Sequence, residues 1–266
     1  MNTNTNAYIL TGSSPTKLGV LDLITNSLYR SECYIYEMHT FDAADTEQFF
    51  FRMEFNYIGT SEFSEDSLRH QLTDRASAFE VEWELRNLLT PEKVVILVPK
   101  YDDCLQDLLH RYSTGALNIG VPAIISNHPD LQEQAGWYNI PYYHLAVTPE
   151  TKVEQEAKMW DIIQQSEADL VVLARYMQVL SEDMCKKLHG QAINIHHSLL
   201  PGFKGAKPYH QAYDKGVKLV GATAHYVSQD LDEGPIISQG VEPVDHTYTP
   251  ERLIAKGRDT ERVTLA

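Results

Sequence analysis

The sequence predicts an α/β protein made of two domains. Three observations lead to this prediction. The chain has 266 residues, which is enough for two ordinary domains. Its first third reads as strand, helix, strand, strand, helix, strand, the βαββαβ order of a ferredoxin-like domain. The remainder alternates near-continuous apolar strands with helices, which is typical of a Rossmann-like, mostly parallel sheet covered on both faces.

The N-terminal domain is expected at residues 5–86. Apolar residues at helical spacing predict its first helix, and alternation of side chains indicates its strands. Ser64, followed by two acidic residues, has the composition of a helix N-cap and first turn. In chain order the predicted elements are the strand 7–10, the helix 18–29, the strands 33–41 and 49–55, the helix 64–78 and the strand 79–85.

A linker is predicted at residues 87–93, because a Thr-Pro dipeptide precedes a new run of β-branched residues there. The second domain is expected at residues 94–266. Its apolar runs are separated by segments with helical spacing. The predicted strands are 94–98, 119–125, 142–145, 170–174, 192–195 and 220–227, with another starting at Ile236, and the predicted helices are 104–112, 131–136, 151–166 and 181–188.

Composition narrows the classes of function. The chain is 43% hydrophobic and 22% charged, as in soluble globular proteins, and its polar start, MNTNTN, is unlike a signal peptide. Its apolar runs are too short for a bilayer, so we expect a cytoplasmic protein with no membrane partner. The formal net charge of −15 argues against a nucleic-acid partner. Three cysteines without a Cys-x-x-Cys pair indicate neither a disulfide framework nor a zinc site.

Polar side chains follow two predicted strands of the second domain. Asn194 and His196 come at the end of the strand 192–195, just before a glycine-containing loop at 201–206. The strand 220–227 runs into a turn that carries the carboxylates Asp230, Asp232 and Glu233. Sheets of this class bind ligands outside the carboxyl ends of their strands. The pattern therefore predicts an acid/base site at this edge of the sheet.

Two segments, NIHHSLLPGFKGAKPYHQAY and GATAHYVSQDLDEGPII, together resemble the signature of the formyltetrahydrofolate-dependent transferases and hydrolases. The doubled histidine and the PYHQAY segment resemble the deformylases of this group more closely. The similarity also covers PKYDDCLQDLL, SNHPDL and LARYMQVLS. It extends over nearly the whole chain, because deformylases begin with an ACT domain of βαββαβ form.

The resemblance implies a hydrolase that cleaves 10-formyltetrahydrofolate into formate and tetrahydrofolate, supplies formate for purine synthesis and balances the one-carbon folate pool. It implies that Asn194, His196 and Asp232 are catalytic and that the folate is the substrate, with no cofactor. We expect no metal, because no His-x-x-x-His or Cys pair presents the candidate ligands at ligand spacing. These candidates are His196, His197, His210, His225 and Asp232. An amide donor can stabilise the oxyanion that forms, and an imidazole held by a carboxylate can move a proton. The division of proton transfer between His196 and Asp232 stays open. The substrate-binding residues that the resemblance implies are Tyr176, Met177, Gln178, Val179, Leu180, His197, Asp230 and Leu231.

Two alternatives remain. A formyltransferase of the glycinamide ribonucleotide type needs to hold a phosphate, and the loop 99–103 has no glycine and two acids, which serves a phosphate poorly. A non-catalytic ACT amino-acid sensor would not need to retain the Asn, His and Asp trio. The resemblance also implies an amino-acid effector at the ACT domain and a homo-oligomer. We expect the oligomer to cover an apolar face formed by Phe49, Phe51 and Phe55.

The chain departs from the deformylase pattern in three places. Asp103 stands before Cys104 where these proteins usually have a histidine. The segment TGSSPTKLG replaces a Cys-Pro-Asp turn in the first domain, which puts an effector site there in doubt. The chain ends at GRDTERVTLA, whereas the family continues with a further helix and strand, so we expect a truncated chain whose last helix is cut.

Overall fold

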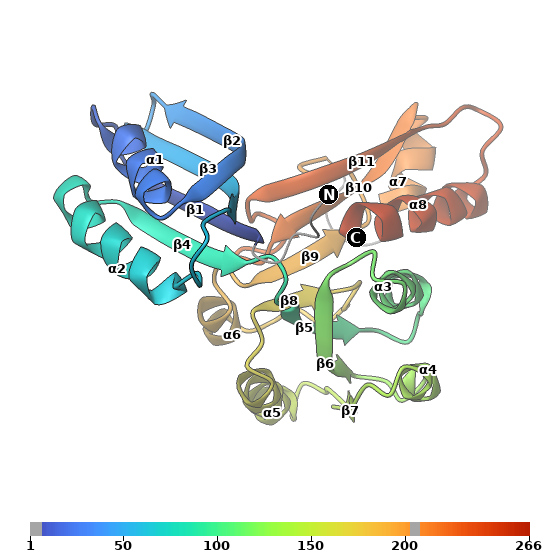
Figure 1. Ribbon diagram of the computed structural model, residues 1–266. Coiled ribbons are helices and arrows are strands. Elements are labelled where there is room, and N and C mark those ends of the chain that lie inside the picture. The colour runs from blue at the N-terminus through green and yellow to red at the C-terminus, as the bar shows by residue number, and fades with distance from the viewer. Residues whose placement is uncertain (1–6, 203–207) are drawn as a thin grey trace. The chain divides into compact units, whose positions relative to one another are not determined.

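The structure is a computed structural model that describes residues 7–202 and 208–266. The start of the expected first domain, at residues 5 and 6, and most of the glycine-containing loop 201–206 lie outside the described residues. The chain divides into two compact units, Met1–Pro91 and Glu92–Ala266, each with its own sheet and helices (Figure 1). Residues 92 and 93, expected in the linker, belong to the first strand of the second unit.

The first unit is a four-stranded antiparallel sheet with the strand order β2-β3-β1-β4. Two helices lie on one side of this sheet (Figure 1). Its elements are β1 (Ala7–Pro15), α1 (Val20–Arg30), β2 (Cys33–Ala43), β3 (Gln48–Tyr57), α2 (Glu65–Ala76), a 3-10 turn (Ser77–Phe79) and β4 (Glu82–Asn87). The element order and the strand order are those of a ferredoxin-like domain, as the sequence predicted.

Local backbone geometry explains how the elements of the first unit differ from the predicted ones. Ser64 caps α2 as predicted, and its hydroxyl accepts a hydrogen bond from the Ser67 N–H at 3.2 Å. The first helix begins two residues later than predicted, because Gly19 has a φ of 100°. The last strand begins three residues later than predicted, because Ser77–Phe79 continues α2 as a 3-10 turn.

The predicted exposed face of Phe49, Phe51 and Phe55 is wrong. Phe51 is 4% and Phe55 0% exposed, and both belong to the core beneath the helices, against which Phe49 also packs. Successive side chains of a strand point to opposite faces, so Phe50, which is 44% exposed, lies on the other face. The exposed aromatic residues of β2 are Tyr34, Tyr36 and Phe41.

The second unit is a seven-stranded sheet with the order β11-β10-β9-β8-β5-β6-β7. Its strands are β5 (Glu92–Val98), β6 (Ile119–Ser126), β7 (Tyr142–His144), β8 (Leu170–Leu173), β9 (Ala192–His196), β10 (Leu219–Tyr226) and β11 (Ile236–Pro243). The five strands from β7 to β9 run parallel, whereas β10 is antiparallel to both β9 and β11. The prediction of a mostly parallel α/β sheet is confirmed.

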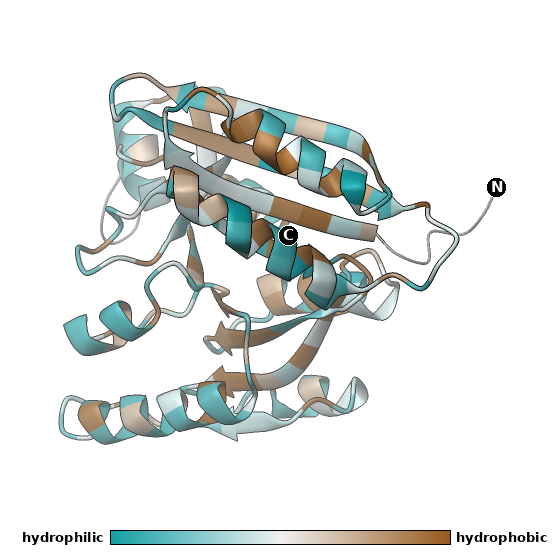
Figure 2. Cartoon of the chain, turned by 60° about the vertical axis from the view of Figure 1, so that its left-hand side comes forward, coloured by the Kyte–Doolittle hydropathy of each residue, from teal (hydrophilic) through white to brown (hydrophobic). Residues whose placement is uncertain are grey.

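Helices cover both faces of this sheet. They are α3 (Asp103–Ser113), α4 (Gln132–Trp137), α5 (Lys152–Gln165), α6 (Glu182–Lys187), α7 (Pro208–Lys215) and α8 (Pro250–Leu265). The alternate residues Val94, Ile96 and Val98 of β5 pack with α3, α4 and α8, whereas Val95 and Leu97 pack with α5 and α6. Figure 2 shows the central strands as hydrophobic and the outer helix surfaces as largely hydrophilic. This two-sided burial accounts for the near-continuous apolar runs.

No residue ranges were predicted for the two helices α7 and α8. The start of α8 nevertheless carries standard signals, since Thr249 caps it and Pro250 occupies its first turn. No helix within residues 7–202 and 208–266 combines the length and the apolar character needed to cross a membrane.

A glycine allows α7 and α8 to pack closely. A Cβ atom at Gly257 would lie 2.0 Å from the Tyr209 ring. Tyr209 cannot easily give way, because its hydroxyl donates a 2.7 Å hydrogen bond to the buried carboxylate of Glu261. By contrast, a Cβ atom at Gly136 in α4 would meet no atom within 4 Å.

We predict that Gly257→Ala lowers the free energy of unfolding of the second unit by about 1–3 kcal/mol, the usual cost of overpacking. Gly136→Ala should raise it by about 0.4–1 kcal/mol, because alanine restricts the unfolded chain. Urea unfolding followed by circular dichroism measures both changes. Stabilisation by both substitutions would contradict the close packing described for Gly257.

Candidate active site

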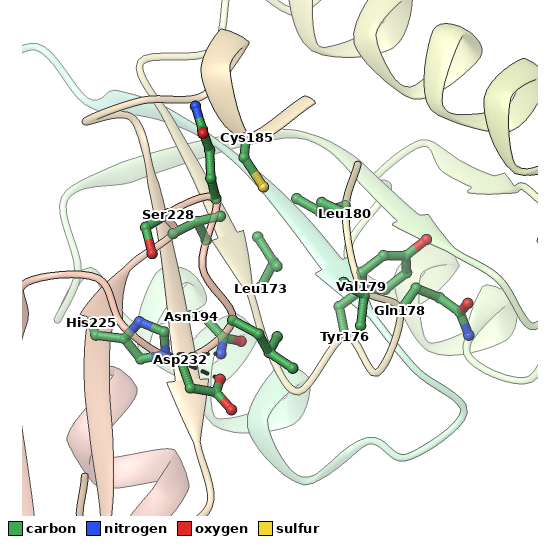
Figure 3. A pocket seen from close by; sticks show the side chains of 13 residues that line it. Leu173, Tyr176, Gln178, Val179, Leu180, Cys185, Asn194, His225, Ser228 and Asp232 are labelled. Atoms are coloured by element: carbon green, nitrogen blue, oxygen red, sulfur yellow. Dashed lines mark hydrogen bonds and ion pairs between the residues drawn. The ribbon is translucent and has the colours of Figure 1, made fainter. Parts of the chain in front are cut away.

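The strand pairing brings two polar side chains together at the carboxyl end of β9. Asn194 of β9 lies directly opposite His225 of β10 in the antiparallel register. Side chains of directly opposite residues lie on the same face of a sheet. The Asn194 Nδ2 atom is 3.2 Å from His225 Nε2 (Figure 3).

The hydrogen bonds of His225 determine its tautomer. Its Nδ1 atom lies 2.9 Å from the Tyr226 carbonyl oxygen. A carbonyl only accepts, so Nδ1 carries the proton and Nε2 accepts from the Asn194 amide. Burial lowers the pKa of His225 below its ordinary value, which favours this neutral ring. One N–H of Asn194 is therefore engaged, and the orientation of its amide is fixed.

Sequence reasoning missed His225 as a site residue and considered it only as a potential metal ligand. Its role depends on lying opposite Asn194, and this requires the register between β9 and β10. Within residues 7–202 and 208–266, no three His, Cys, Asp or Glu side chains are grouped to hold a metal ion.

His196 and Asp232 form a buried, hydrogen-bonded pair. The distance from His196 Nδ1 to Asp232 Oδ2 is 3.3 Å, and their side chains are 6% and 9% exposed. The hydrogen bond from His196 lowers the pKa of Asp232, which keeps the carboxylate charged. The other Asp232 oxygen, Oδ1, lies 3.8 Å from His225 Nε2. The structure thus brings all three predicted catalytic residues into one group.

The turn that carries Asp232 is conformationally demanding. Asp232 has a φ of 59°, in the left-handed region that residues other than glycine adopt only at a cost of about 1 kcal/mol or more. Two residues later, a Cβ atom at Gly234 would lie 1.8 Å from the Tyr226 carbonyl oxygen, so the close approach requires glycine. Such strain concentrates at functional sites, because it persists only where the surrounding structure enforces it.

A pocket opens beside Asn194 and Asp232. Its polar end contains these two residues and His225, and its opposite wall is formed by residues of the segment after β8 (Figure 3). The lining residues are Leu173, Tyr176, Gln178, Val179, Leu180, Cys185, Asn194, His225, Val227, Ser228, Gln229, Leu231 and Asp232. An apolar pocket with a few polar groups at one end is typical of a small-molecule site.

Five of the eight predicted substrate-binding residues line this pocket, namely Tyr176, Gln178, Val179, Leu180 and Leu231. The other three do not. Met177 is 61% exposed, and Asp230 is an exposed turn residue. His197 instead contributes to a smaller cavity that Tyr209 also lines.

His197 lies behind His196. Their rings stack with centroids 5.2 Å apart, and the His197 ring lies 6.2 Å from that of Tyr209. Burial, with smaller contributions from the charges of His196 and Arg175, lowers the pKa of His197 to about 4. His197 is therefore neutral near pH 7 and provides an uncharged platform for His196.

The fold and the site together define an α/β enzyme suited to cleaving or transferring an acyl group. An amide donor, an imidazole and a charged carboxylate stand at the end of an apolar pocket, where they can stabilise an oxyanion and move protons.

Comparisons with known proteins identify the family. Residues 92–266 match the formyl transferase family model. The formyltetrahydrofolate deformylase of Corynebacterium sp. (strain P-1) is 46% identical over 97% of this chain and 90% of its own length. The crystal structure of a formyltetrahydrofolate deformylase from Pseudomonas putida KT2440 has a TM-score of 0.92 and 54% identity, covering 98% of this chain and 92% of that one. The chain belongs to the formyltetrahydrofolate deformylase family.

A related class of enzymes is similar to only part of this chain. The phosphoribosylglycinamide formyltransferase from Anaplasma phagocytophilum has a TM-score of 0.59 and 35% identity, and it covers 64% of this chain and 81% of its own. The transferase and the deformylases therefore share a fold, and the difference in reaction must come from details of the site.

We predict that His197 makes the second unit less stable in mild acid. Its pKa is about 4 in the folded state and 6.5 ordinarily, so below pH 6.5 the unfolded chain takes up the proton first. The contribution of neutral His197 to the free energy of unfolding is complete above pH 6.5 and is lost as the pH falls toward 4. Between pH 7 and pH 5 the loss amounts to about 2 kcal/mol at most.

Urea unfolding of the parent chain and of His197→Gln at these two pH values measures this contribution. The variant should lose less stability on acidification than the parent. His110→Gln, a change at an exposed histidine of the same unit, is the control. An unchanged pH dependence in His197→Gln would refute the prediction.

Proposed function

We propose that this protein hydrolyses 10-formyltetrahydrofolate to formate and tetrahydrofolate. The observation that carries the proposal is the hydrogen-bonded His196–Asp232 pair next to the oriented Asn194 amide, at the polar end of an apolar pocket. Membership of the deformylase family supports the same reaction.

The residues supply the chemistry that hydrolysis needs. When water attacks the formyl carbon, negative charge develops on the formyl oxygen, and a fixed amide donor stabilises it. One N–H of Asn194 is held by His225, which directs the other toward this oxygen. The His196–Asp232 pair takes the proton that water loses and passes a proton to the departing folate nitrogen. Asp232 stabilises the imidazolium while the proton is in transit.

The pocket suits a folate at its apolar end. Val179, Leu180 and Leu231 offer apolar surface, and Gln178 adds a polar group to the wall. The reaction uses water and protein groups alone, so we propose that no metal or cofactor takes part. A non-catalytic sensor has no use for a buried imidazole–carboxylate pair beside a pocket, which argues against that alternative.

The finer assignments are also proposals. We propose that the ferredoxin-like unit is an ACT domain that binds an amino-acid effector, and that the enzyme acts in the cytoplasm, where it supplies formate for purine synthesis. The resemblance to deformylases supports these assignments, and the antiparallel βαββαβ unit agrees with the first of them.

We predict that Asp232→Asn and His196→Ala each lower turnover by about a hundredfold to ten-thousandfold, the usual cost of losing an oriented acid/base group. Asn194→Ala removes an oxyanion donor, which raises the barrier by about 3–4 kcal/mol. Folate binding should change little, because the apolar wall is untouched. Formate release under single-turnover conditions and folate affinity by fluorescence quenching separate the two effects.

Asp230→Asn is the matched control, because Asp230 is an exposed carboxylate of the same turn. It should change turnover by less than about tenfold. An inactive Asp230→Asn together with an active Asp232→Asn would show that the catalytic carboxylate has been assigned to the wrong residue.

We predict a homo-oligomer that uses the outer face of the first sheet. Phe41 and Phe50 are paired across β2 and β3 and are 65% and 44% exposed, and Tyr34, at the other end of β2, is 60% exposed. Exposed aromatic side chains on one sheet are typical of an interface. Light scattering at micromolar concentrations should give a mass above that of one chain, and Phe41→Asp should lower it. Trp137→Asp, a change at an exposed aromatic residue of the other unit, should not.

A further inference from the structure

A second polar group lies at the carboxyl ends of β5 and β8, and the proposed reaction does not use it. We call it the Arg175 cluster. Tyr101 precedes α3, Arg175 follows β8, and the remaining members come from α3 and α8. The full set is Tyr101, Asp103, Arg175, Arg258 and Glu261.

Arg175 lies at the centre of this cluster. Its Nη1 is 3.3 Å from Asp103 Oδ2, and its Nε is 2.9 Å from Glu261 Oε2, although that N–H is not aligned for a hydrogen bond. The guanidinium groups of Arg175 and Arg258 lie 5.8 Å and 5.9 Å from the centroid of the Tyr101 ring. Arg258 also approaches Asp103, with its Nε 3.6 Å from Oδ2. Ion pairs and cation–π contacts thus join all five side chains.

This arrangement is costly for the fold. The Glu261 side chain is 0% and the Arg175 side chain 15% exposed, and burying such a pair is often no better for stability than an apolar replacement. Arg175 also has a φ of 63°, a left-handed conformation that costs about 1 kcal/mol or more for a residue other than glycine. Apart from the hydrogen bond from Tyr209 to Glu261, these contacts therefore give the fold little stability that apolar side chains would not give.

The cluster adjoins the catalytic group. Tyr209 donates a 2.7 Å hydrogen bond to Glu261 Oε1, and its ring contacts His197, which stacks on His196. The apolar pocket reaches the catalytic group through Asn194 and Asp232 and includes no member of the cluster. The cluster is thus connected to the catalytic residues through Tyr209 and His197, whereas the pocket is lined by catalytic residues directly.

The position of the cluster matters because parallel α/β sheets bind ligands in the crevice outside the carboxyl ends of their strands. Both β5 and β8 are central strands of the sheet. A hydrolase and a formyltransferase differ in the nucleophile that attacks the formyl carbon, which is water in one and an amine nitrogen in the other. Water needs almost no space, whereas an amine acceptor needs room for the rest of its molecule.

We propose that the Arg175 cluster is a specificity determinant that fills the acceptor side of the crevice, so that water and not an amine reaches the formyl carbon. This inference rests on the proposed function. If the cluster is opened, a small primary amine attacks the formyl carbon, the bond from that carbon to the folate nitrogen breaks, and the folate nitrogen takes up the proton that the amine loses. The products are an N-formyl amine and tetrahydrofolate.

The test measures how the formyl group is partitioned between water and an added amine. The double variant Arg175→Gly with Glu261→Gln removes the two most buried charged groups of the Arg175 cluster. It also relieves the left-handed strain at Arg175 and leaves no unpaired buried carboxylate. With glycinamide or hydroxylamine present, the ratio of N-formyl amine to formate should rise by about tenfold or more over the parent. Arg111→Ala, which breaks an Asp107–Arg111 ion pair of α3 outside the cluster, should leave the ratio unchanged.

Tyr101→Ala is a second variant that keeps the buried charges and so protects the fold. It should raise the same ratio. If both variants release formate but give no more N-formyl amine than the parent, the inference is overturned, because a merely structural role changes the rate without changing the partition. If the parent itself releases no formate, the proposed function fails, and this inference fails with it.

Discussion

His196 ends β9, and Asp232 lies in the turn between β10 and β11, with its Oδ2 atom 3.3 Å from His196 Nδ1. The reversal of strand direction between β9 and β10 places the end of β10 beside Ile193, near the start of β9, so the turn has to fold back along the sheet to bring Asp232 to His196. The left-handed φ at Asp232 and the close approach of Gly234 then direct the carboxylate to the imidazole. The strain of the turn is the cost of this placement.

The same reversal organises the electrostatics of the site. It places His225 opposite Asn194, where a neutral ring orients the amide. Burial keeps His225 and His197 neutral, whereas Asp232 stays charged through its bond to His196. Different environments thus separate the protonation of neighbouring titratable groups, which is how one site holds an acid and a base at the same pH. Among these four side chains, Asp232 is the one that its surroundings keep charged.

Much of the fold could be predicted from the sequence, because buried parallel strands give apolar runs such as residues 94–98 and because caps such as Ser64 have a clear composition. The grouping of Asn194, His196 and Asp232 could be predicted from the motifs that carry them. The alternation of side chains along β3 shows that the strand has two faces but does not show which face the helices bury. Phe51 was therefore assigned to the exposed face, although it lies in the core. His225 depends on strand register, and the contact of Arg175 with Glu261 joins a strand end to a helix whose residue range was not predicted.

The central claim is that this site directs water at a formyl carbon. The most direct test is hydrolysis of 10-formyltetrahydrofolate in water enriched in ¹⁸O, with the formate analysed by mass spectrometry and tetrahydrofolate measured by its absorbance. The account predicts that each formate carries one oxygen from the labelled water and that tetrahydrofolate forms in equal amount. Formate without the label, or tetrahydrofolate formed without formate, would contradict it.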